Sequence, residues 1–205
     1  MEKAGKIKRL FKRFERELEK REDLSGKRPV FSSGDPSSPI AIVGEAPGRK
    51  ETELGIPFVG RAGSFFMNIL EEVFKRPRDS FYVTNVVKLW PTIPTKRLKT
   101  RPPSKEEIEF FLPLLKKELE IVNPRIIICA GRIAFQSVTG SREFEHGRII
   151  KMDDRVIACL YHPAYILRRK DREELTSGLR KILRRLRRYQ GSPSSGGFTG
   201  PHTGQ

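Results

Sequence analysis

The pattern of apolar and polar positions along the chain predicts five helices. The first is amphipathic, because Ile7, Phe14 and Leu18 recur at helical spacing among many Lys, Arg and Glu residues. Ser104 followed by Glu107 is a capping box, which marks the start of the third helix. The expected helices span residues 5–22, 64–73, 104–122, 132–138 and 171–189.

Short apolar runs between these helices predict strands. The runs are residues 40–43, 81–88 and 124–131, and two further runs within 147–160 flank Asp153-Asp154 as a hairpin. Strands that alternate with helices are typical of an α/β sandwich built on a mostly parallel sheet. We therefore expect an α/β fold.

The chain divides into three parts. Residues 1–30 are expected to hold a basic helix packed on the domain, and residues 31–189 the domain itself. The Gly-, Ser- and Pro-rich tail, 190–205, is expected to be disordered. Residues 91–103, rich in Pro, Thr and Lys, are expected to form an exposed basic loop.

The amino-acid composition indicates the kind of partner that the protein binds and the cellular compartment in which it acts. The chain has 205 residues and a formal charge of +16, which favours a polyanion such as nucleic acid over a merely solubilising surface. Few Asn and Gln beside many Lys, Arg and Glu are typical of proteins from hot environments. Cys129 and Cys159 lie in apolar runs and have no metal-ligand spacing. Without a membrane-length apolar run or a signal peptide, we expect a cytoplasmic, nucleoid-associated protein.

Polar side chains follow three of the predicted strands. Glu45 comes after the first strand, Asn85 lies late in the second, and His162 follows the last. Ligands of open α/β sheets bind at the carboxyl ends of the strands. The Gly- and Pro-rich loop that carries Glu45 also carries Phe58. This convergence predicts a binding site.

The four side chains suit a planar heterocycle. Phe58 offers a flat apolar face, Asn85 an amide with a donor and an acceptor at fixed spacing, and His162 an imidazole. Taken singly, each has an ordinary structural explanation: Glu45 as a cap, Asn85 and His162 as satisfied buried groups, and Phe58 as core. The joint pattern favours the site.

Three sequence blocks resemble the signature motifs of family-4 uracil-DNA glycosylases. They are Gly44-Glu-Ala-Pro-Gly48 with Gly60-Arg-Ala-Gly63, then Thr84-Asn-Val-Val-Lys88, then His162-Pro-Ala-Tyr-Ile-Leu-Arg168. Their order and spacing match over about residues 30–170. The resemblance implies a three-layer α/β/α sandwich with a central, mostly parallel four-stranded sheet, and removal of uracil from DNA.

The resemblance also implies a role for each matching residue. Phe58 would stack on a flipped-out uracil, Asn85 would read its edge, and His162 would bind O2 and stabilise the departing anion. Glu45 would position or activate the attacking water, and the loop at Gly44 and Ala46 would contact the base through its backbone. A wedge loop entering the duplex, together with the neighbouring motif residues, would contact DNA through Arg61, Ala164, Tyr165, Ile166, Leu167 and Arg168.

One family feature is missing from the sequence. Family-4 enzymes carry an iron–sulfur cluster on four cysteines, and the matching positions here are Leu89, Phe111 and the segment 19–22. We therefore expect no cofactor, with Leu89, Trp90 and Phe111 filling the vacated space. The absence of these cysteines affects the expected scaffold more than the expected chemistry, although a divergent member could have an altered base preference.

The expected function is base excision repair: hydrolysis of the N-glycosidic bond of uracil in DNA, leaving an abasic site. Two alternatives stay open, a glycosylase for hypoxanthine, xanthine or mispaired thymine, and a non-catalytic DNA-binding module with the same fold. The expected partner is uracil-containing DNA, held by the basic N-terminal helix, residues 96–101 and residues 180–188. We expect a monomer that binds no membrane; any replication or repair partner stays open.

Overall fold

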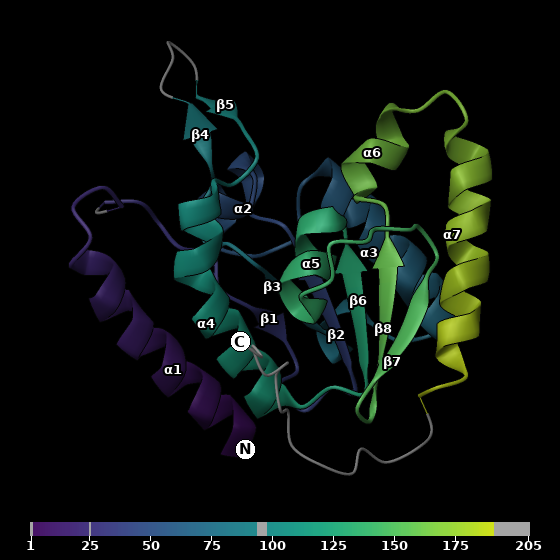
Figure 1. Cartoon of the computed structure of the whole chain (residues 1–205), viewed down its shortest axis with the longest axis horizontal. Helices are drawn as coiled ribbons and strands as arrows, with labels where there is room; N and C mark the ends of the chain where they lie inside the picture. Colours follow the sequence, from purple (N-terminus) through teal and green to yellow (C-terminus); the bar gives the residue numbers. More distant parts are fainter. Residues whose placement is uncertain (1, 25, 94–97, 191–205) are drawn as a thin grey trace.

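A six-stranded mixed sheet forms the centre of the protein. The computed structural model describes residues 2–24, 26–93 and 98–190, so the expected tail from Gly191 lies outside the described residues. The strand order is β1-β3-β2-β6-β8-β7 (Figure 1). The strands are β1 (Ser33–Gly34), β2 (Ile40–Gly44), β3 (Tyr82–Asn85), β6 (Ile126–Ala130), β7 (Ile149–Met152) and β8 (Arg155–Leu160).

The inner strands β3, β2, β6 and β8 are parallel, as expected, and the two edge strands are antiparallel to their neighbours. The expected four-stranded sheet therefore corresponds to the parallel centre, and the two edge strands are additional. The hairpin at Asp153-Asp154 is β7–β8. Strand β1 is only two residues long, which is too short to leave an alternating pattern in the sequence.

Helices cover both faces of the sheet. They are α1 (Glu2–Glu19), α2 (Arg49–Leu54), α3 (Arg61–Phe74), η1 (Arg78–Ser80), α4 (Lys105–Val122), α5 (Arg132–Thr139), α6 (Pro163–Arg168) and α7 (Arg172–Arg187). All five expected helices are present. The short helices α2 and α6 were not expected, because six residues are too few to show a helical period.

Alternation along the strands produces two hydrophobic cores. In β2, Ile40 and Ile42 face a cluster that includes residues of α3 and α7, whereas Ala41 and Val43 face one that includes residues of α1, α4 and α5. Figure 1 shows these helices in layers on opposite sides of the sheet. The fold is thus a three-layer α/β/α sandwich.

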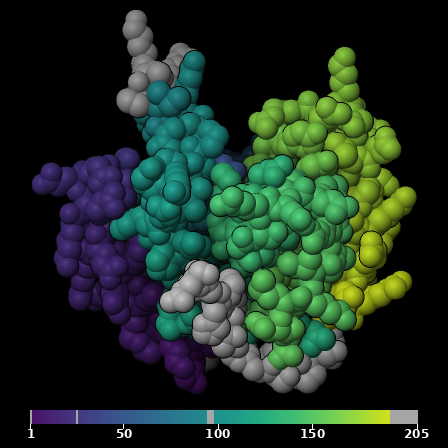
Figure 2. All heavy atoms as spheres, in the orientation of Figure 1, coloured from purple at the N-terminus to yellow at the C-terminus, as the bar shows by residue number. Residues whose placement is uncertain are grey.

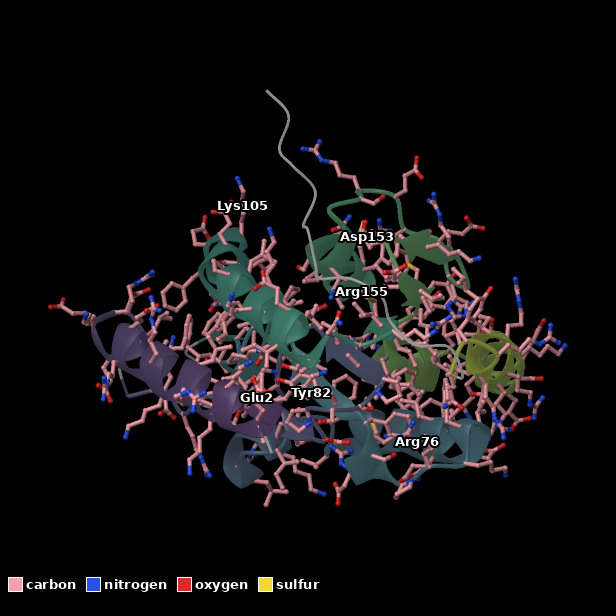
Figure 3. The ribbon with its side chains drawn as sticks, turned by 90° about the horizontal axis from the view of Figure 1, so that it is seen from below. Glu2, Arg76, Tyr82, Lys105, Asp153 and Arg155 are labelled. Atoms are coloured by element: carbon pink, nitrogen blue, oxygen red, sulfur yellow. The ribbon has the colours of Figure 1, made fainter. Side chains whose placement is uncertain are left out.

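Helix α1 packs along α4 on the outside of one layer. The Phe14 ring centroid lies 5.3 Å from that of Phe110 and 5.4 Å from that of Phe111. The expected capping box starts α4, since Ser104 Oγ accepts from the Glu107 N–H at 3.2 Å and the Ser104 N–H donates to Glu107 at 2.8 Å. From below, α1 and α4 run side by side while nitrogen-ended side chains point outwards (Figure 3).

The sequence pattern predicts an exposed loop over residues 91–103, but the structure shows more than a loop there. The segment contains an antiparallel pair, β4 (Thr92–Ile93) and β5 (Lys99–Thr100), which projects from the body. The Trp90 indole N–H donates to Thr100 Oγ1 at 2.9 Å and ties the base of this arm together. Strands of two residues carry too little alternation to be recognised among Pro, Thr and Lys.

No helix in the described part of the chain combines the length and the apolar character needed to cross a membrane.

We expect Phe111→Ala to lower the free energy of unfolding by about 3–5 kcal/mol, the usual cost of removing a buried aromatic ring. Phe111 is fully buried and contacts both α1 and the sheet-facing core. Chemical denaturation measures the change. Lys116→Ala, at an exposed position of the same helix, is the control and should stay near wild type.

Candidate active site

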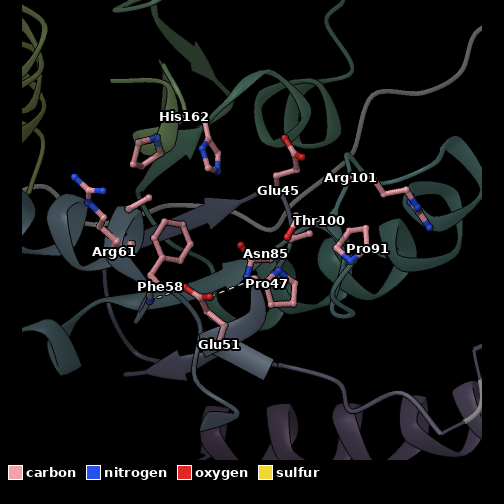
Figure 4. A pocket seen from close by; sticks show the side chains of 16 residues that line it. Glu45, Pro47, Glu51, Phe58, Arg61, Asn85, Pro91, Thr100, Arg101 and His162 are labelled. Carbon is pink, nitrogen blue, oxygen red and sulfur yellow. Dashed lines mark hydrogen bonds between the residues drawn. The ribbon is translucent and has the colours of Figure 1, made fainter. Parts of the chain in front are cut away.

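A cavity of about 260 Å³ opens at the carboxyl edge of the parallel sheet. Glu45, Phe58, Asn85 and His162 all line it, although they are spread over more than half of the chain (Figure 4). Glu45 follows β2, Asn85 ends β3 and His162 follows β8. The carboxyl ends of parallel strands meet at one edge, so the sheet itself brings these side chains together.

Gly44, the last residue of β2, lies directly beneath two of these side chains. A Cβ atom at this position would lie 2.2 Å from Asn85 Oδ1 and 2.6 Å from Phe58 Cζ. Both distances are far below a normal contact. The ring and the amide can therefore sit side by side only because this residue has no side chain.

Phe58 is held from two sides in an unusual backbone conformation. Its φ is 57°, in the left-handed region that non-glycine residues rarely adopt. The Arg78 guanidinium donates to the carbonyl of Phe58 at 3.1 Å and also to that of Pro57. A Cβ on Gly63 would lie 2.4 Å from Phe58 Cα. The chain around the ring is thus fixed by hydrogen bonds and by close backbone contact with α3.

Glu51 fastens the two halves of the Gly/Pro-rich loop, and the sequence analysis did not single it out. One carboxylate oxygen accepts from the Gly60 N–H at 2.7 Å and the other from the Gly48 N–H at 3.2 Å (Figure 4). Gly48 precedes α2, and Glu51 is the third residue of that helix. The capping-box spacing was the available signal, but the bond to Gly60 has no local signature.

His162 is the N-cap of α6. Its Nδ1 accepts a hydrogen bond from the Ala164 N–H at 3.2 Å, so the neutral imidazole carries its proton on Nε2. Burial, with a smaller contribution from the positive charge of Arg168, lowers the pKa of His162. The cavity therefore has a neutral imidazole whose Nε2–H is a hydrogen-bond donor.

Glu45 supplies a carboxyl group at the same rim. Burial raises the pKa of Glu45, because the charged form loses hydration there. A carboxylate with a raised pKa is a better proton acceptor than one in water. Glu45 and His162 lie on the same side of the cavity, across from Asn85 (Figure 4).

Asn85 is almost completely buried, with 2% of its surface exposed. It pairs with Gly44 in the sheet, and the next two residues continue the ladder: Val86 N–H donates to Gly44 at 2.9 Å and Val87 N–H to Glu45 at 3.0 Å. The peptide that carries the amide is therefore locked to the loop that carries the carboxylate.

The expected DNA-contact residues divide into two groups. Arg61 lines the cavity, and Tyr165 and Arg168 are exposed on α6. Ile166, however, is fully buried in the core, so its expected place in a wedge is wrong. The segment is a helix, and the three-residue spacing puts Ile166 on the same inner face as buried Pro163.

Two further expected contacts are also residues of α6. Ala164 is half-buried near its start, and Leu167 lies against a separate hollow between α3 and α7. Neither side chain lines the cavity. Among the expected wedge residues, Tyr165 and Arg168 are the exposed ones.

The β4–β5 arm adds a wall that the sequence analysis missed. Pro91, Thr100 and Arg101 line the cavity from this side. The Arg101 guanidinium makes two hydrogen bonds to the Glu107 carboxylate, at 2.6 and 2.8 Å, which fixes it in place. The arm and the α6 region rise on either side of the molecule's upper edge (Figure 2).

Comparison with known proteins assigns this arrangement to a family. The model of the uracil DNA glycosylase superfamily matches residues 31–187, which include every residue that lines the cavity. The chain belongs to the uracil DNA glycosylase superfamily.

The proteins similar to this chain include three that are named type-4 uracil-DNA glycosylases. The protein from Archaeoglobus fulgidus is 35% identical over 161 residues, covering 73% of this chain and 77% of its own length. That from Sulfurisphaera tokodaii is 33% identical, covering 75% and 69%. That from Pyrobaculum aerophilum is 37% identical, covering 70% and 75%.

The iron–sulfur cluster implied by the resemblance does not fit the residues of this superfamily member. Leu89 and Phe111, at two of the expected ligand positions, are 2% and 0% exposed and belong to one hydrophobic core. Cys129 and Cys159 are buried opposite each other on β6 and β8. The described residues hold no group of three or more His, Cys, Asp or Glu that could bind a metal. That the protein works without a cofactor stays a prediction.

We expect Gly44→Ala to destabilise the protein by about 1–3 kcal/mol, the cost of overpacking, because its methyl group would overlap Asn85 and Phe58. Gly178→Ala in α7 is the matched control. Nothing lies within 4 Å of a Cβ there, so it should stabilise by about 0.5–1 kcal/mol. Chemical denaturation of both variants measures the contrast, and equal effects would contradict the close contact.

The pKa of His162 predicts a loss of stability in acid. An imidazole in the unfolded chain takes up its proton near pH 6.5, and the folded protein does so only at lower pH. Below pH 6.5 the unfolded state therefore binds more protons, and the free energy of unfolding falls as the pH drops.

His162→Asn tests this dependence, because an Asn can cap α6 but cannot titrate. Denaturation at a pH above and a pH below 6.5 should show a smaller fall for the variant than for wild type. His146, whose pKa burial also lowers, leaves a remaining dependence in both proteins. An identical fall would contradict the assignment.

Proposed function

We propose that the protein is a uracil-DNA glycosylase that hydrolyses the N-glycosidic bond of uracil in DNA and leaves an abasic site. One observation carries the proposal: a single small cavity is lined by an aromatic ring, a buried amide, a neutral imidazole donor and a carboxyl group. Membership of the superfamily and the names of the relatives support it.

Recognition rests on Phe58 and Asn85. A base that leaves the duplex stacks on the Phe58 ring, and the Asn85 amide pairs with the N3–H and O4 edge of uracil. Cytosine presents an acceptor and an amino group at that edge. Because Asn85 is buried and locked to Gly44, a cytosine leaves polar groups unpaired at a cost of about 1–3 kcal/mol each.

His162 assists departure of the base. The C1′–N1 bond breaks with its electron pair passing to the uracil ring, and negative charge develops on O2. The Nε2–H group of the neutral imidazole donates a hydrogen bond to O2 and so stabilises this charge. The capping hydrogen bond from Ala164 keeps the donor nitrogen towards the cavity, because it occupies Nδ1.

Glu45 acts on the sugar. The positive charge that develops at C1′ is stabilised by a nearby carboxylate, and the same group accepts a proton as water adds to C1′. The bond from the water oxygen to C1′ replaces the broken bond to N1. The uracil anion then takes up a proton and Glu45 releases the proton that it accepted from water, so the products are free uracil and an abasic site. The raised pKa of Glu45 suits this proton transfer at neutral pH.

The surrounding surface holds the DNA. We expect Arg61 at the cavity and Arg168 on α6 to contact phosphates, and exposed Tyr165 to fill the gap left by the flipped base. The formal charge of +16 adds a sequence-independent attraction. Affinity should therefore fall steeply with salt.

The activity is tested with end-labelled oligonucleotides that carry one uracil, one hypoxanthine, one xanthine or one thymine opposite guanine, followed by alkali. Cleavage at uracil supports the proposal. Cleavage confined to another base would show that this base is the substrate. Binding without cleavage would show a non-catalytic DNA-binding module.

Asn85→Ala and His162→Ala should each lower the single-turnover rate at uracil by about 10²–10³-fold, as for the loss of a buried donor in the transition state. Binding of uncleaved DNA should stay within about threefold, because phosphate contacts dominate affinity. Lys116→Ala, far from the cavity, is the control. Wild-type single-turnover rates in both variants would show that Asn85 and His162 do not take part in the reaction.

A further inference from the structure

A fully buried ion pair lies behind the recognition amide. Lys88 Nζ and Glu118 Oε2 are 2.8 Å apart, and both side chains are 0% exposed. Lys88 follows β3 in the chain, and Glu118 lies on α4. Neither is among the residues that line the cavity, so the pair does not contact the base directly.

The ammonium group of Lys88 has three acceptors, one for each of its protons. It donates to Thr84 Oγ1 at 2.7 Å, to Glu118 Oε2 at 2.8 Å and to the main-chain carbonyl of Asn85 at 2.6 Å. Thr84 in turn donates to Glu118 Oε2 at 3.0 Å. The group is therefore satisfied, and one of its bonds reaches the residue that carries the amide.

The carbonyl of Asn85 needs this donor because of where the sheet ends. Edge strand β1 pairs only with Tyr82 and Val83 and does not reach Asn85. A buried carbonyl without a donor is costly, and Lys88 supplies the bond that a longer edge strand would have given. The side chain thus takes the place of a missing strand.

Stability alone does not explain a charged pair at this position. Burial lowers the pKa of Lys88 and raises that of Glu118, since both charged forms lose hydration. Replacing a buried ion pair with apolar residues of similar volume is often neutral or stabilising. What distinguishes this pair is its hydrogen bond to the Asn85 carbonyl.

We propose that Lys88, held by Glu118 and Thr84, is a positioning residue that fixes the Asn85 peptide so that the amide meets the uracil edge. The inference rests on the proposed function. Geometry leaves the amide little freedom, since Asn85 Oδ1 already lies against Gly44 and the peptide is bonded on both sides. A displacement of about 1 Å at a recognition group can cost about a hundredfold in rate.

The test uses the double variant Lys88→Met/Glu118→Met, which removes both charges while it keeps apolar volume. Its thermal midpoint should fall, because the Asn85 carbonyl loses its donor, but the protein should stay folded at the assay temperature, and its affinity for uncleaved DNA should be unchanged. The single-turnover rate at uracil should fall about 10- to 100-fold. A wild-type rate would overturn the proposal.

A double-mutant cycle with Asn85→Ala separates positioning from a general structural effect. If Lys88 acts through Asn85, adding Asn85→Ala to the Met/Met background should cost at least tenfold less than it costs in wild type. Equal costs in both backgrounds would overturn the proposal even if the Met/Met protein is slow.

Glu118→Gln is the second variant, in case the Met/Met protein does not fold. Its amide oxygen can still accept from Lys88, so the rate should fall less than in Lys88→Met, and the reverse order would count against the proposal. The wild-type assay separates the two ideas. No excision of uracil by wild type rejects the proposed function and this inference together, whereas normal excision with additive losses rejects only the inference.

Discussion

The missing side chain at Gly44 is the constraint on which the site depends. It lets the Phe58 ring and the Asn85 amide occupy the space directly above the end of β2, where a methyl group would come within 2.2 Å of the amide oxygen. The proposed stacking on Phe58 and edge recognition by Asn85 need both groups close to the same base, and the absence of a side chain at Gly44 permits this. A glycine at a strand end therefore allows an aromatic ring and a buried amide to lie side by side in the cavity.

Hydrogen bonds to main-chain groups hold that contact in place. Glu51 joins the two arms of the loop through Gly48 and Gly60, and Arg78 holds the carbonyls beside Phe58. Lys88 does the same for Asn85 from the far side. In each case a charged side chain, itself outside the chemistry, satisfies a backbone group that irregular structure would otherwise leave unpaired. Rigid positioning of this kind is how a small cavity reaches high selectivity.

The sequence predicted the sheet and the principal side chains because both follow local rules. Apolar runs mark buried strands, and polar residues directly after them mark the edge where parallel strands end, which located Glu45, Asn85 and His162. Glu51, Lys88 and Glu118 were not found in this way, since the contact of Glu51 with Gly60 and the pairing of Lys88 with Glu118 join segments that are apart in the sequence. The assignment of Ile166 to a wedge went wrong for a related reason. Motif resemblance places a residue in a segment, whereas the helical phase of that segment, set here by Pro163, decides which side chains reach solvent.

Apolar packing between α1, α4 and the residues after β3 occupies the positions at which the family resemblance implies cluster cysteines. Four metal ligands would tie these segments together by covalent geometry, and here Phe14, Leu89 and Phe111 lie in one continuous core instead. Glu118 extends from the same helix as Phe111 to Lys88 and thus to Asn85. The packing of α4 is therefore connected to the recognition amide through one buried ion pair. A change in the packing of α4 can therefore reach the site through Glu118 and Lys88.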